Sequence, residues 1–150
     1  MRKLGIILFL AAIIITGCDK QKFDTPRDVV VHLFGAMERD DQSAIVYLVD
    51  LPSMMGLENE DYALKTDNPR TFYNPQDILD DLTGEGLTKR RWFSMQRVIG
   101  QTEYNGDSAL VDVSFINKET GVQYYNKFGL CKKKDRWMIY SFRTIKDKKE

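Results

Sequence analysis

The chain has 150 residues, of which 43% are hydrophobic and 29% are charged. This length suffices for one domain with a hydrophobic core and is short for two. The 22 basic and 22 acidic residues cancel, which argues against a nucleic-acid binder and against an acidic disordered chain. Two cysteines and a single histidine, His32, exclude a disulfide-stapled scaffold, a four-thiolate zinc site and a multi-histidine metal centre.

The first 17 residues have the pattern of a secretory signal. Arg2 and Lys3 form a positive n-region, and residues 4–15 carry no charge. An apolar run of this length fits the hydrophobic region of a signal peptide and falls short of the roughly 20 residues needed to span a bilayer. We therefore expect residues 1–17 to be a signal peptide that is cleaved.

The residues at the end of this segment have a specific spacing. Ile15 is aliphatic, Thr16 and Gly17 are small, and Cys18 follows. This pattern resembles the lipobox of bacterial lipoproteins. The resemblance implies that signal peptidase II cuts after Gly17 and that Cys18 carries a lipid, so that residues 18–24 are a lipidated tether. An ordinary secretory signal or an uncleaved anchor, with Cys18 incidental, is the alternative.

A lipidated N-terminus predicts a location in the bacterial cell envelope, with the domain extracytoplasmic. Contact with the membrane would run through the lipid on Cys18, since several acyl chains give stable anchoring. Asp19 slightly favours the inner over the outer membrane, because an aspartate at this position retains lipoproteins there in some proteobacteria. Residues 19–24 reach about 20 Å, so we expect the domain to lie close to the bilayer. The second cysteine, Cys131, is expected to be an unreactive strand residue.

The domain assigned to residues 25–150 begins with a predicted helix. Thr25 is a suitable N-cap and Pro26 a suitable first helical residue. His32 lies opposite the apolar stripe of this helix, and we expect it to be exposed and without a catalytic role. The apolar residues recur at helical spacing: Val30, Leu33, Phe34 and Met37.

A second helix is predicted directly after the first. Asp40 and Asp41 end the first helix and cap the second, and Pro52 is expected to terminate it. The inner stripe of this helix consists of Ala44, Ile45, Leu48 and Val49. The pattern then dissolves, and residues 52–74 read as loop or very short helix packed down by methionine and leucine side chains.

A third helix and a change of period follow. Asn74 and Pro75 open the helix, and Gly84 and Gly86 end it. Beyond Arg91 the hydrophobic period changes from helical to alternating, which predicts a series of strands. Helices followed by a meander of antiparallel strands indicate the α+β class.

Four strands are predicted in this second half, at residues 92–104, 109–115, 122–133 and 136–145. Asn105-Gly106, between the first two, is a strong hairpin signal. The second strand alternates strictly, with Ala109, Val111, Val113 and Phe115 on one face. On the last strand, Trp137 and Ile139 are predicted on one face and Met138, Tyr140 and Phe142 on the other. Because both faces are apolar, we expect both sides of the sheet to be covered.

This order of elements resembles the nuclear transport factor 2-like superfamily, a cone-shaped fold, and in particular small bacterial lipoproteins that carry such a domain. The resemblance implies N-terminal helices packed on a curved antiparallel four-stranded meander. Its motifs are a cap, turns and core positions, so they specify fold rather than function. The motifs are Thr25-Pro26, Asp40-Asp41 to Tyr47-Leu48, Gly106 to Val113, and Trp137-Met138-Ile139.

The resemblance implies two kinds of function. Enzymes of the superfamily, such as ketosteroid isomerase and scytalone dehydratase, carry Asp, Tyr or His inside the cone, and other members bind partners. Here Asp112 lies opposite the inward face of its strand, so we predict no catalytic residue, metal ligand or cofactor site. Aromatic residues are candidates for lining a cavity, although such residues more often fill a core. They are Phe34, Tyr47, Trp92, Tyr124, Phe128 and Trp137.

We therefore expect a membrane-anchored lipoprotein with a non-catalytic domain that binds an envelope protein or a second copy of itself, and no nucleic acid. One alternative is a small-molecule carrier, which needs a cone cavity left open rather than filled by Trp92 and Trp137. Another is a cavity enzyme of the isomerase or dehydratase type, which needs a buried acid next to a tyrosine.

Overall fold

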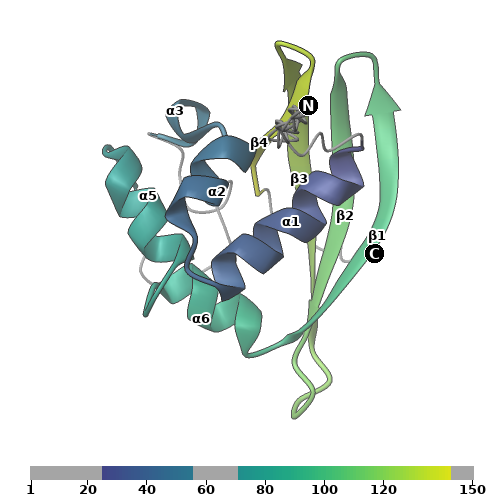
Figure 1. The fold of residues 1–150 in the computed structure, drawn as a ribbon. Coiled ribbons are helices and arrows are strands. Elements are labelled where there is room, and N and C mark those ends of the chain that lie inside the picture. Colours follow the sequence, from purple (N-terminus) through teal and green to yellow (C-terminus); the bar gives the residue numbers. More distant parts are fainter. Residues whose placement is uncertain (1–24, 56–70, 143–150) are drawn as a thin grey trace, which may run out of the picture.

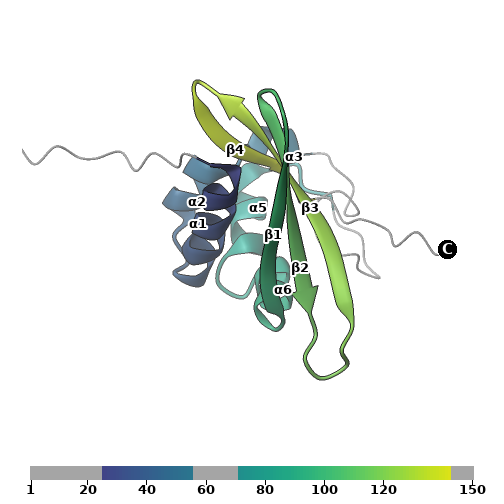
Figure 2. The same ribbon diagram turned by 90° about the vertical axis from the view of Figure 1, so that its right-hand side faces the viewer.

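A layer of helices packs on one face of a four-stranded antiparallel sheet that curves around it (Figures 1 and 2). The computed structural model describes residues 25–55 and 71–142. The strand order is β1-β2-β3-β4, a simple meander, so the predicted α+β class is confirmed. The predicted signal peptide, lipobox and tether, together with residues 56–70 and 143–150, lie outside the described residues.

Three of the described helices, α1, α2 and α5, begin where the sequence predicts helix caps. Thr25, Asp41 and Asn74 each accept a hydrogen bond from a backbone N–H in the first turn that follows, at 2.9–3.1 Å, which satisfies a donor that the helix itself leaves open. None of the described helices is long and apolar enough to cross a membrane. The helices are α1 (Pro26–Glu38), α2 (Gln42–Leu48), α3 (Leu51–Met54), α5 (Pro75–Leu82) and α6 (Leu87–Phe93).

Two features of the first helices differ from the prediction. Pro52 does not terminate α2, which ends at Leu48 because Val49 is extended and forms a parallel bridge to Ile139. Pro52 instead lies in the first turn of α3, where its missing N–H leaves no helical bond unmade. His32 is half-buried rather than exposed, because α1 packs against α2 and against three strands.

The second and third strands agree with the prediction to within one residue, whereas the last strand ends at Ser141 instead of running on through Phe142, and its predicted residues 143–145 lie outside the described residues. The first strand also differs. Residues 92–95 are not part of it, because α6 continues to Phe93 and β1 starts at Gln96. The predicted hairpin is present, with Asn105 paired to Ser108 and Gly106 in the left-handed region at φ 58°. The strands are β1 (Gln96–Asn105), β2 (Ser108–Ile116), β3 (Gln123–Lys133) and β4 (Arg136–Ser141). The predicted alternation of β2 is confirmed, since Ala109, Val111, Val113 and Phe115 are all buried.

A β-bulge in β4 reverses the predicted orientation of one residue. Gly129 pairs with Ser141 and Leu130 pairs with Ile139, so Tyr140 is an extra residue on its strand. The bulge places Phe142 in the core with Ile139, and the prediction that it shares a face with Tyr140 was wrong. Cover on the outer face of the sheet stays a prediction, because the described helices lie on the inner face (Figure 2).

The corner between α2 and α3 is joined to the edge of the sheet by Asp50. Its backbone N–H donates to the Ile139 carbonyl at 2.7 Å, and its carboxylate accepts from the Ser53 hydroxyl and the Lys133 ammonium. The residue is 5% exposed. Burial by itself raises the pKa of Asp50, but the hydrogen bonds from Lys133 and Ser53 outweigh it and hold the pKa below its ordinary value.

Replacing Asp50 by Asn should lower the free energy of unfolding at neutral pH by about 1–2 kcal/mol, a modest value because Lys133 is half-exposed. The folded pKa of Asp50 is depressed. Its charge therefore stabilises the fold fully above the unfolded pKa of about 3.9, and this contribution disappears as the pH falls through the folded pKa. Urea unfolding at about pH 7 and pH 3 should show the difference between wild type and variant shrinking at low pH. A difference that stays constant would contradict this account, and the exposed Asp107→Asn serves as the control.

Candidate functional site

The inside of the cone is occupied by a cluster of aromatic rings around Trp92. This side chain has no exposed surface. Its ring stacks on Phe115 with centroids 5.1 Å apart and meets Phe142 edge-on at 5.1 Å. Phe128 lies at 5.4 Å and Phe34 at 5.8 Å on other sides of the indole. Contacts at these distances leave no room between neighbouring rings, so α6 inserts Trp92 as a core residue.

The six aromatic residues predicted to line a cavity do not form one group. Phe34, Trp92 and Phe128 belong to the central cluster, which also contains Phe115 and Phe142. Trp137 is buried elsewhere and packs at 6.2 Å from Tyr104. Tyr47 and Tyr124 are exposed by 37% and 42%, and the Tyr47 ring lies 3.8 Å from the Arg136 guanidinium.

Two buried carboxylates lie among the described residues, and both have structural partners. Asp50 joins the α2–α3 corner to the sheet, as described above. Asp81, at the end of α5, accepts from the Leu87 and Thr88 N–H groups at 3.1 and 3.4 Å and from the Thr88 hydroxyl at 2.5 Å. Asp81 therefore caps the start of α6, where Gly86 has no side chain to do so.

Cys131 lies half-buried on β3. Burial raises the pKa of its thiol, and the nearby charge of Asp50 raises it further, while Lys133 acts in the opposite direction. A thiol with a raised pKa forms little thiolate at neutral pH and is a poor nucleophile. This environment agrees with the expectation of an unreactive strand residue.

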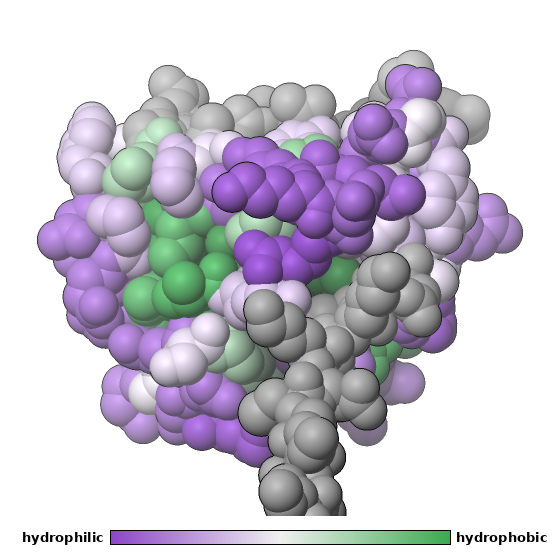
Figure 3. All heavy atoms as spheres, turned by 45° about the horizontal axis from the view of Figure 1, so that its top comes forward, coloured by the Kyte–Doolittle hydropathy of each residue, from purple (hydrophilic) through white to green (hydrophobic). Residues whose placement is uncertain are grey.

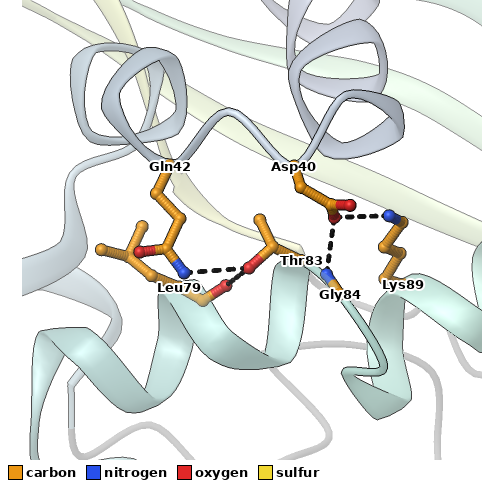
Figure 4. Close-up of polar contacts among 6 residues, drawn as sticks. All are labelled: Asp40, Gln42, Leu79, Thr83, Gly84 and Lys89. Carbon is orange, nitrogen blue, oxygen red and sulfur yellow. Dashed lines mark hydrogen bonds and ion pairs between the residues drawn. The ribbon is translucent and has the colours of Figure 1, made fainter.

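Polar contacts connect the turn between α1 and α2 to the turn between α5 and α6 and to α6 itself (Figure 4). Asp40 closes α1 in a left-handed conformation at φ 56°. Its carboxylate accepts from the Gly84 N–H at 2.6 Å and from the Lys89 ammonium at 2.5 Å. These hydrogen bonds, from Lys89 first, hold the pKa of Asp40 below its ordinary value. Asp40, just after α1, is thereby joined both to the turn between α5 and α6 and to α6 itself.

A second set of contacts runs beside the first (Figure 4). The Gln42 side-chain amide donates to the Thr83 hydroxyl at 3.0 Å, and that hydroxyl donates to the Leu79 carbonyl at 2.7 Å. Gln42 also reaches Asp80 at 3.2 Å. The start of α2 is therefore connected to the last turn of α5, beside the contact from Asp40 to Lys89 of α6.

An open pocket of about 410 Å³ lies where α6 passes into β1, beside the turn between β2 and β3. This junction is at the lower end of the molecule in Figure 1. Sequence reasoning did not single it out, although a signal exists: residues 86–102 contain four basic residues and no acidic one. The pocket is lined by Phe93, Ser94, Met95, Gln96, Arg97 and Lys118, none of which belongs to the predicted cavity set.

Arg97 is the half-buried cation of this pocket. Its guanidinium lies 4.0 Å from the centre of the Phe93 ring and 5.6 Å from that of Phe34. One of its nitrogens donates to the Trp92 carbonyl at 3.3 Å. Burial lowers the pKa of Arg97, and the charge of Glu38 acts in the opposite direction. No carboxylate among the described residues lies within ion-pair distance of this guanidinium.

The opposite end of the molecule has a different character. Figure 3, which brings that end forward, shows hydrophilic surface with an apolar patch beside it on the side of the helices. Exposed apolar side chains of the helical layer include Val31 on α1 and Val46 on α2. Apolar surface rimmed by polar residues is typical of regions that contact other proteins.

The fold is that of the nuclear transport factor 2-like proteins. A designed protein of that fold superposes with a TM-score of 0.52 over 81% of this chain and 97% of its own, at 10% sequence identity. The likeness is therefore one of backbone architecture. No family model matches the sequence, and no curated protein matches it either.

Proposed function

We propose that the chain is a lipid-anchored lipoprotein of the bacterial envelope whose extracytoplasmic domain binds a partner and does not catalyse a reaction. The anchor is supported by the spacing of Ile15, Thr16, Gly17 and Cys18 after an uncharged segment. The observation that carries the binding role is the aromatic cluster around Trp92, which occupies the space that enzymes and carriers of this fold use for a ligand. Interaction is therefore assigned to the surface.

The geometry gives less support to the two alternatives. A carrier needs an open apolar interior, whereas Trp92 is fully buried among four phenylalanine rings. A cavity enzyme needs a carboxyl whose environment prepares it for proton transfer. The two buried acids among residues 25–55 and 71–142, Asp50 and Asp81, instead use their oxygens to join helices to neighbouring elements. A copurifying small molecule that leaves only on denaturation, detected by native mass spectrometry, would favour the carrier.

The anchor is tested by expressing the full chain in bacteria that are fed an alkyne-bearing fatty acid. We expect Cys18→Ala to abolish labelling and to move the protein out of the membrane fraction, because the thioether then cannot form. Cys131→Ala is the matched control and should keep both label and location. Labelling that survives in Cys18→Ala, or a wild-type protein without label, would contradict the lipoprotein assignment.

The binding role is tested by cross-linking the protein in intact cells and identifying the products by mass spectrometry. A cross-linked envelope protein, or a cross-linked pair of these chains, would support the proposal. A turnover that is lost when a residue of the aromatic cluster is replaced in a still-folded variant would overturn it. Neither the cross-link nor the turnover is detected through the fatty-acid label. The outcome for binding is therefore separate from the outcome for the anchor.

A further inference from the structure

Arg97 differs from three lysines of the fold in having no carboxylate partner among the described residues. Lys89 pairs with Asp40, Lys127 with Glu103 and Asp112, and Lys133 with Asp50. Arg97 is half-buried, and among the described residues its side-chain hydrogen bond is to one backbone carbonyl, that of Trp92. Glu38 acts on it through space without forming an ion pair.

A half-buried guanidinium with open donors favours an anion. The group has five N–H donors in a planar fork that matches the oxygens of a carboxylate or a phosphate. One donor is used by the Trp92 carbonyl, and the Phe93 ring supports the face of the group at 4.0 Å. Removing a charge from water without a counter-charge is unfavourable. An anion should therefore bind beside Arg97 with a more favourable free energy than beside an exposed lysine.

The pocket beside Arg97 supplies the rest of a ligand site. Lys118, in the turn between β2 and β3, brings a second positive charge to the lining. Ser94 and Gln96 add neutral polar side chains, and Phe93 and Met95 add apolar surface. The volume of about 410 Å³ lies in the range of small-molecule sites. The lining contains no acidic residue, although Glu119 follows Lys118 in the same turn.

We propose that this pocket binds a small organic anion, with Arg97 and Lys118 holding its carboxylate or phosphate and Phe93 and Met95 contacting its apolar part. The site lies outside the filled interior of the cone, so it requires no open cavity among the central rings. The proposal goes beyond partner binding at the envelope and is independent of whether Cys18 carries a lipid.

A purely structural role for Arg97 is the competing explanation. A cation next to the last carbonyls of α6 stabilises that end of the helix, and stacking on Phe93 adds to it. This role accounts for one hydrogen bond and for the ring contacts, and it involves Lys118 in no way. The two explanations therefore differ in what they predict for anion binding and for Lys118.

The test is a titration of the ¹⁵N-labelled full chain in detergent with benzoate, with phenyl phosphate and with the neutral analogue benzamide. We expect both anions to shift the amide signals of Ser94, Gln96 and Arg97, with dissociation constants of about 1 mM or tighter. Benzamide should bind at least about tenfold more weakly, because it lacks the charge. A stronger response to phenyl phosphate than to benzoate would assign the natural ligand to the phosphates, and the reverse to the carboxylates.

Three variants distinguish a built site from general positive charge. Arg97→Gln should weaken benzoate binding by about tenfold or more, and Lys118→Gln by about threefold to tenfold. Arg90→Gln removes an exposed cation of α6 outside the lining and should change binding by less than about twofold. Because Lys118 is exposed, its variant keeps the test valid if Arg97→Gln fails to fold. Benzamide binding as tightly as benzoate, equal effects of Arg90→Gln and Lys118→Gln, or no shifts below about 10 mM would each overturn the proposal.

Discussion

Replacing Trp92 by Ala should destabilise the domain by about 3–5 kcal/mol, because the indole is fully buried and four aromatic rings lose their common neighbour. The free energy of unfolding of a domain of this size is about 5–15 kcal/mol. The variant should therefore remain folded only under mild conditions. Urea unfolding followed by circular dichroism measures the loss. We expect a lower midpoint and an unchanged slope.

The same variant offers a direct test of how the interior is filled. An apolar cavity left by a large-to-small substitution stays dry and can bind an apolar molecule of matching size. Added indole should therefore raise the midpoint of Trp92→Ala and leave wild type unchanged, since ligand binding to the folded state stabilises it.

Two control variants separate burial from aromatic character. Tyr124→Ala removes an aromatic side chain that is 42% exposed and should cost less than about 1 kcal/mol. Trp92→Phe keeps a ring and removes the indole N–H, which has no hydrogen-bond partner among the described residues, so it should cost much less than Trp92→Ala. Equal losses for Trp92→Ala and Tyr124→Ala would contradict the central position of Trp92.

The parts of the fold that sequence predicts well are those determined locally. Thr25, Asp41 and Asn74 are N-caps because their side chains accept a hydrogen bond from the next turn, and such a contact needs only neighbouring residues. The strict alternation of β2 and the turn at Gly106 are also local patterns. Together they are sufficient to indicate helices followed by an antiparallel meander.

The errors arise where a distant residue determines the local structure. The change of period after Arg91 predicts Trp92 in a strand, whereas Trp92 lies in α6. The start of this helix is capped by Asp81 from the end of α5 and not by an N-cap side chain of its own. Alternation predicts that Phe142 shares a face with Tyr140, whereas the bulge at Tyr140, which depends on the pairing with β3, turns Phe142 into the core. Periodicity within one segment contains neither piece of information.

The candidate site depends even more on residues that are distant in the sequence. Residue type alone predicts Phe34, Trp92 and Phe128 as cavity-lining residues, and they fill the interior instead. Tyr47 and Tyr124, predicted on the same ground, are exposed. The pocket at the start of β1 combines Arg97 with Lys118, which the sheet brings together from different parts of the chain. The run of basic residues without acids was visible in the sequence, whereas the pocket beside it required the fold.

Replacing Gly86 by Ala should cost about 3 kcal/mol, because its Cα lies against the end of α5. A Cβ placed there would be 2.2 Å from the Asp81 carbonyl oxygen and 2.4 Å from that of Asp80. Both are backbone atoms, so the clash can be relieved only by moving α5 and α6 apart. That movement would stretch the hydrogen bonds from Leu87 and Thr88 to Asp81.

Gly84 is the matched control for this effect. It lies in the same turn, and its constraint is the backbone conformation instead of a close contact. It adopts φ 54°, and among the described residues no atom lies within 4 Å of the place that a Cβ would take. Gly84→Ala therefore meets conformational strain and no clash. Its cost should be about 1 kcal/mol, and Gly84→Asn should recover part of it because Asn tolerates the left-handed region.

The two glycine variants should also differ in what they do to the pocket. Because Gly86→Ala displaces α6, it should shift the amide signals of Ser94 and Arg97 at the far end of that helix, whereas Gly84→Ala should change signals near the turn only. Urea unfolding and the ¹⁵N spectrum of each variant measure both effects. Equal losses of stability in the two variants would show that close packing at Gly86 does not position α6.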